Sequence, residues 1–238
     1  MSGHSKWATT KRKKWAVDAK RSAIFTKLAN LITIAAREGG DPAMNFKLRL
    51  AIDKAKSASM PKENIDRAIK RGTGELGGAA IEEIIYEGYG PGGVAILILC
   101  LTDNRQRAVS EIRSVFNKFG GSLAEAGSVS YLFEKKGQII ISQTENSKTV
   151  EQLGEIIINS GADDFEIESD DLIIYTQIFE LQKVVGFFRD AGIKIQSSEI
   201  VYLPKSFVEV SSDKKPAVEK LLSALDDLDD VSEIFTNG

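Results

Sequence analysis

The chain contains one cysteine and one histidine among its 238 residues. A single cysteine excludes a disulfide within the chain, and one residue of each type is too few to supply the ligands of a zinc site. Cys100 stands inside the apolar run 94–101, so we expect a buried, unreactive thiol. No metal site is therefore expected.

Long apolar runs are also absent. No stretch of about 18 apolar residues exists, so the sequence predicts no membrane-spanning helix and no membrane partner. Residues 1–7 have no apolar segment behind their basic residues, and a secretory signal is therefore not expected. We accordingly expect a cytoplasmic protein. Apolar residues make up 42% of the chain, enough to give each of one to three domains a buried core.

Two glycine-rich stretches lack the context of a phosphate-binding loop. Residues 72–77 fit the pattern G-x-G-x-x-G, but they follow a predicted helix, whereas a dinucleotide-binding loop follows a strand. Residues 88–93 lie between two predicted strands, where a tight hairpin is favoured over an anion-binding nest. We therefore expect no cofactor.

Acidic residues are scarce in one part of the chain. Residues 1–72, here called the basic head, contain 17 lysines and arginines and 6 acidic residues. Residues 73–238, here called the acidic body, contain 14 and 28. The two parts carry formal charges of +11 and −14, which sum to the overall −3. A cationic segment attached to an anionic body indicates a polyanionic partner, nucleic acid first of all.

Residues 1–78 are expected to form a basic helical domain. Apolar residues recur at helical spacing over about 16–38 and 45–58, and Pro61 is placed to open a third helix. The glycines of residues 72–78 interrupt this periodicity and indicate a linker.

Beyond the linker, the apolar period changes to that of strands. Residues 134–204 predict the order strand, helix, strand, strand, helix, strand, which is that of a ferredoxin-like domain. Predicted strands at 128–133 and 206–210 complete a second such order from the flanking segments. We therefore predict an α+β, multidomain fold with an N-terminal three-helix domain and two ferredoxin-like α/β domains, one inserted in the other. The predicted domains are 1–78, 79–133 with 205–238, and the inserted 134–204.

Two tryptophans are interleaved with cations in residues 5–21. We expect the cations to contact phosphates, and Trp7 or Trp15 to stack on an unpaired base or lie on a sugar. The alternative is a solvated basic tail whose tryptophans dock on the head's own core. No base-reading motif is present, so we expect backbone contacts to dominate. The predicted nucleic-acid-binding residues are His4, Lys6, Trp7, Lys11, Arg12, Lys13, Lys14, Trp15, Lys20, Arg21 and Lys27.

Two further arginines stand at the start of a predicted helix. Asp103 or Asn104 is the expected N-cap, which puts Arg105 and Arg107 in the first turn. Cations there oppose the positive end of the helix dipole. Two explanations stay open: a secondary contact with an anionic partner, or salt bridges to the acidic body.

Many short segments resemble the bacterial YebC/PmpR family, which has mitochondrial relatives. The resemblance runs from end to end of the chain. The matching segments are GHSKW (3–7), DAKR (18–21), IFTKL (24–28), AAREGGDP (35–42), AIDKAK (51–56), MPKENI (60–65), RAIKRG (67–72), YEGYGPGG (86–93), LTDNR (101–105) and FEKKG (133–137).

The resemblance implies a helical N-terminal domain and two α/β domains around a cleft. Bacterial members are generally described as DNA-binding transcriptional regulators, and the mitochondrial branch contains translational activators of a cytochrome oxidase subunit. The chain departs from the family at residues 11–15, where relatives often carry a histidine beside an Arg-Lys pair and end on a small residue. The positive charge is kept, so phosphate binding is still expected.

Together these observations predict a non-enzymatic, nucleic-acid-binding regulator of gene expression. Two partners stay open: duplex DNA, for a transcriptional regulator, or ribosomal RNA, for a ribosome-associated translation factor. The acidic body would then meet the ribosome or another protein. A hydrolase or transferase in the interdomain cleft is disfavoured, because the sequence offers no convincing nucleophile with a base and no paired carboxylates. No small-molecule substrate is expected.

Overall fold

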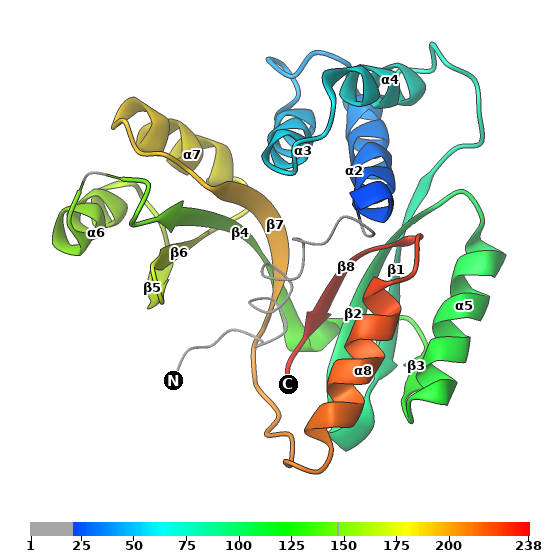
Figure 1. The fold of residues 1–238 in the computed structure, drawn as a ribbon. Coiled ribbons are helices and arrows are strands. Elements are labelled where there is room, and N and C mark those ends of the chain that lie inside the picture. The colour runs from blue at the N-terminus through cyan, green and yellow to red at the C-terminus, as the bar shows by residue number, and fades with distance from the viewer. Residues whose placement is uncertain (1–20, 147) are drawn as a thin grey trace.

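The computed structural model describes residues 21–146 and 148–238, in which three helices stand beside two antiparallel sheets (Figure 1). Among the helices of this part, none is both long and apolar enough to cross a bilayer. The helices are α2 (Arg21–Ala35), α3 (Phe46–Ser57), α4 (Lys62–Gly72), α5 (Arg105–Lys118), α6 (Val150–Asn159), α7 (Leu181–Asp190) and α8 (Lys215–Asp226). The strands are β1 (Glu82–Tyr89), β2 (Ala95–Thr102), β3 (Ser122–Ala124), β4 (Phe133–Ser142), β5 (Asp164–Glu168), β6 (Asp171–Thr176), β7 (Ser197–Pro204) and β8 (Val231–Thr236).

Helices α2, α3 and α4 share one core, as predicted. Apolar residues at helical spacing face inward from each helix, among them Ile32 and Leu48, which are fully buried. Asn45 caps α3 by accepting a hydrogen bond from the Leu48 amide at 3.0 Å. Its amide nitrogen also donates to the carbonyl of Ala35 at 2.7 Å, which ties the start of α3 to the end of α2.

Helix α4 continues through Gly72, where the sequence predicted the start of a linker. A Cβ at this position would overlap the Thr33 carbonyl oxygen and lie 2.6 Å from Ala36 Cβ. Only a glycine therefore lets the last turn of α4 approach α2 so closely.

The second sheet has the strand order β5-β6-β4-β7 and is antiparallel throughout. Helices α6 and α7 cover one of its faces, so the predicted ferredoxin-like order is confirmed (Figure 1). Side chains alternate along β4: Ile139 and Ile141 belong to the helix-covered core, whereas Gln138 and Ile140 point to the opposite face.

The first sheet has the order β3-β1-β2-β8, with α5 and α8 over one face (Figure 1). It is also ferredoxin-like, but the predicted strand at 206–210 is wrong. Strand β1 takes that place between β2 and β3, and residues 207–210 run as irregular chain, with the Val208 amide donating to the Asn237 carbonyl at 2.8 Å.

Cys100 is buried in the core of the first sheet, and burial raises the pKa of its thiol to about 12. The predicted domain boundaries themselves stay a prediction.

The predicted strand at 128–133 is also wrong. The carboxylate of Glu87, on β1, accepts hydrogen bonds from the amides of Gly127, Val129 and Ser130 at 2.8, 2.6 and 2.9 Å. These donors are therefore unavailable to a strand partner, and residues 130–132 form a 3-10 turn instead. The first sheet takes its remaining strand, β3, from Ser122–Ala124.

Glu87→Gln should lower the free energy of unfolding by about 2 kcal/mol, because amide hydrogen bonds to a charged acceptor are lost in a buried position. Burial opposes ionisation of Glu87, but the three backbone hydrogen bonds outweigh it and lower the pKa of the carboxyl. The stabilisation is thus present above the carboxyl's ordinary pKa, about 4.5, and is lost as the pH falls through the lowered value. Urea unfolding at pH 7 and at pH 3 measures both effects. Glu83→Gln, at an exposed position of the same strand, is the control and should change little.

Candidate nucleic-acid interface

Nine of the predicted binding residues lie outside the described residues: His4, Lys6, Trp7, Lys11, Arg12, Lys13, Lys14, Trp15 and Lys20. Arg21, which is described, is exposed at the start of α2, with its guanidinium carbon 5.6 Å from the centre of the Phe25 ring. This stacking leaves the donors of Arg21 open to an anionic partner.

Lys27 is placed differently from the other predicted cations. Its Nζ donates to the carbonyl oxygen of Asp226 at 2.5 Å and lies 3.8 Å from a carboxylate oxygen of the same residue. The lysine thereby joins α2 to the end of α8, where the helix dipole favours a cation. Only 16% of its side chain is exposed, so we leave Lys27 out of the proposed interface.

Arg105 and Arg107 both form salt bridges with the acidic body. Arg107 makes a bidentate pair with Asp230, at 2.8 and 3.0 Å, and also contacts Asp103 at 3.0 Å. Arg105 pairs with Glu82 on β1. The salt-bridge explanation therefore accounts for both arginines without an anionic partner, and Asn104 is the N-cap of α5.

Other cations of the basic head are exposed and were not singled out from the sequence. Arg67 and Lys70 lie on the side of α4 opposite its buried residues, Ile65 and Ala68. The helical period of α4 is the signal that could have identified them. Within the part of the chain that the structure describes, these exposed cations have no carboxylate partner: Arg37, Lys56, Lys62, Arg67 and Lys70.

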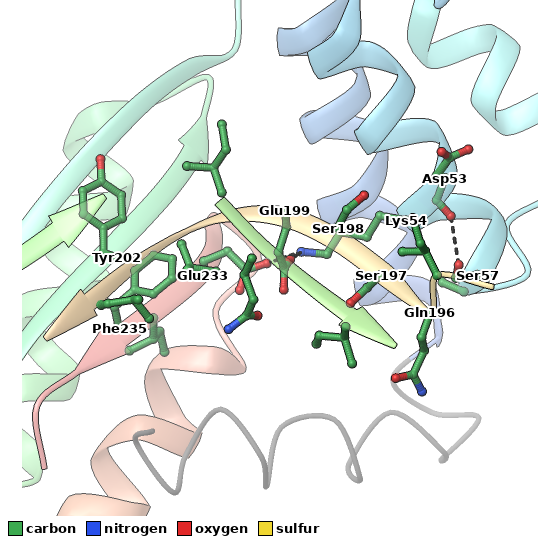
Figure 2. A pocket seen from close by; sticks show the side chains of 18 of the residues that line it. Asp53, Lys54, Ser57, Gln196, Ser197, Ser198, Glu199, Tyr202, Glu233 and Phe235 are labelled. Carbon is green, nitrogen blue, oxygen red and sulfur yellow. Dashed lines mark hydrogen bonds and ion pairs between the residues drawn. The ribbon is translucent and has the colours of Figure 1, made fainter. Parts of the chain in front are cut away.

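One lysine joins the basic head to both sheets (Figure 2). Lys54, on α3, donates to Glu199 on β7 and to Glu233 on β8, each at 2.6 Å. Burial alone would lower the pKa of Lys54, but the two carboxylates outweigh it and raise the pKa, so the ammonium stays charged. Next to it, Asp53 pairs with Arg189 of α7 at 2.9 Å. We call Lys54, Glu199 and Glu233 the junction triad.

A cavity of about 690 Å³ lies beside the junction triad and is here called the central cavity. Helix α3 and strands β4, β7 and β8 contribute to its wall (Figure 2). The family resemblance implied a cleft. The residues that line it could not be predicted, because they come from segments far apart in the sequence.

Lys54→Met should lower the free energy of unfolding by about 2 kcal/mol, because it removes the cation that lies between the carboxylates of Glu199 and Glu233. The matched control is Lys47→Met on the same helix, which removes an exposed pair with Glu38 and should cost less than about 0.5 kcal/mol. Urea unfolding compares the two variants. Equal losses would show that the junction triad contributes no more than a surface pair.

The chain is similar to known proteins over its whole length. Residues 5–75 match the TACO1/YebC protein N-terminal domain, and residues 81–238 match the TACO1/YebC second and third domain. A "probable transcriptional regulatory protein" of Pelotomaculum thermopropionicum is 49% identical over 238 residues, which cover 100% of this chain and 98% of that one. A protein of the same description from Thermotoga maritima is also 49% identical, covering 100% and 93% of the two chains.

A solved structure has the same fold. The crystal structure of a conserved hypothetical protein, Aq1575 from Aquifex aeolicus, matches with a TM-score of 0.86 and 45% identity, over 92% of this chain and 90% of that one. The matches to both family domains and to the full-length relatives agree with the resemblance seen in the sequence. The chain belongs to the TACO1/YebC family.

Proposed function

We propose that this chain is a transcriptional regulator that binds duplex DNA through its basic head, without catalysis and in the cytoplasm. The observation that carries the proposal is the separation of charge, +11 on residues 1–72 and −14 on the remainder. Such a surface attracts the phosphate backbone to one end of the molecule and repels it from the other.

The described part of the basic head supports this proposal. Its cations on the outer side of α4 are exposed and have no carboxylate partner among the described residues. Lys27 and Lys54, in contrast, form ion pairs that hold the head to the acidic body. The proposed DNA surface therefore comprises Arg21, the exposed cations of α4 and the cations of residues 4–20. Its relatives' names, "probable transcriptional regulatory protein", favour DNA as the polyanion.

The salt dependence of DNA binding tests the surface. If about five phosphates are neutralised, the logarithm of the association constant should fall against that of the salt concentration with a slope of about −4.5. Changing Lys11, Arg12, Lys13 and Lys14 together to Gln should flatten the slope by about 0.9 for each phosphate that is no longer neutralised. Fluorescence anisotropy with a labelled 25-base-pair duplex, titrated at several NaCl concentrations, measures it.

The matched control changes four exposed lysines of the acidic body, Lys194, Lys214, Lys215 and Lys220, to Gln. This variant loses the same charge and should keep the wild-type slope. A separate double variant, Arg67→Gln with Lys70→Gln, tests whether α4 contacts the DNA. A flatter salt slope for this variant would show that it does. Equal flattening by the head and body variants would mean that net charge, not a defined surface, controls binding.

Crosslinking in cells followed by sequencing of the bound nucleic acid identifies the partner. Discrete genomic sites, with no enrichment of ribosomal RNA, are expected. Predominantly ribosomal RNA would contradict the choice of DNA and support the ribosome-associated alternative.

A further inference from the structure

Two cations of the central cavity are already paired with carboxylates. Lys54 is held between Glu199 and Glu233, and Asp53 is paired with Arg189 at 2.9 Å. A phosphate group would have to displace these carboxylates from their cations. The interior of the cavity is therefore suited to an uncharged ligand.

One buried polar side chain in this cavity has no partner. Gln138 lies on β4 opposite Glu199 of β7, and its exposed fraction is 6%. Within the described residues its side-chain amide makes no hydrogen bond, although it lines the cavity. The amide is open to the cavity, so a group that both donates and accepts a hydrogen bond can pair with it there.

Uncharged groups complete the wall around Gln138. Ser197, on β7, lies opposite Ile140 on the cavity side of the sheet, and its hydroxyl makes no hydrogen bond among residues 21–146 and 148–238. The rings of Tyr202 and Phe235 lie near one end of it, with their centres 5.2 Å apart (Figure 2). The cavity thus combines free donors and acceptors with aromatic surface, and its volume of about 690 Å³ is within the range of small-ligand sites, roughly 300–1,000 Å³.

We propose that the central cavity binds an unpaired nucleobase, adenine by preference, of a strand whose phosphates the basic head holds. This inference rests on the proposed function and adds a base-binding site to it, which applies where one base of the bound DNA is unpaired. A glutamine amide can accept from N6 and donate to N7 of adenine at once, and an unpaired base offers these atoms with its face free for stacking. Lys56 is exposed at the edge of the same cavity, where the strand's phosphates would lie.

The test compares two 12-nucleotide single strands of thymidine that differ at one central position, adenine in one and an abasic site in the other. Both carry the same phosphates, so the wild-type protein should bind the adenine strand about tenfold more tightly. Gln138→Met removes the hydrogen bonds at nearly constant volume and should abolish this preference without changing the salt slope. The matched control, Gln143→Met, lies outside the cavity and should keep the preference.

A second measurement needs no variant. Wild-type protein should protect the central adenine from modification at N7 by diethyl pyrocarbonate, whereas adenine in the free strand reacts. Equal binding of the two strands, or an unprotected adenine in the complex, would overturn the assignment of the cavity. The proposed binding of DNA by the basic head would still stand if the salt slope stays steep. Wild-type protein that binds neither strand nor duplex would overturn the proposed function, and the cavity assignment with it. Competition by adenosine monophosphate as strong as that of the adenine strand would overturn the assignment to a strand.

Discussion

The ion pairs of Lys54 decide how the three parts of this molecule are arranged. A single ammonium group on α3 binds one carboxylate from each sheet, so the basic head is fixed relative to both sheets at once. Apolar packing reinforces this placement, because Leu50 of the same helix lies in the core of the second sheet and Phe46 packs against it. The central cavity exists because α3, β7 and β8 meet at this point (Figure 2).

This arrangement also sorts the charges of the basic head into two groups. Lysines that face the acidic body, Lys27 and Lys54, are neutralised by its carboxylates and contribute to structure. Cations that face away, such as Arg67 and Lys70, are exposed and form no ion pair within the described residues. The opposite charges of the two parts therefore hold the molecule together on one side of the head, while the cations on its other side stay exposed.

Sequence patterns predicted the helices and the second sheet well, because each of these depends on a local period of apolar residues. The errors in the first sheet come from distant partners. Glu87 diverts the amides of Gly127, Val129 and Ser130 from strand pairing, and β1 occupies the place expected for 206–210. The pairing of Lys27 with Asp226 joins residues 199 positions apart and left no local signal. Gln138 did leave a local signal, since it is a buried polar residue next to the apolar segment 139–141 of β4.

The central claim is that nucleic acid contacts the basic head, and mapping of ultraviolet crosslinks by mass spectrometry tests it most directly. Full-length protein crosslinked to a bound oligonucleotide should yield modified peptides from residues 1–72. Crosslinks confined to α5, α8 and the outer surface of the acidic body, with none in residues 1–72, would contradict the account.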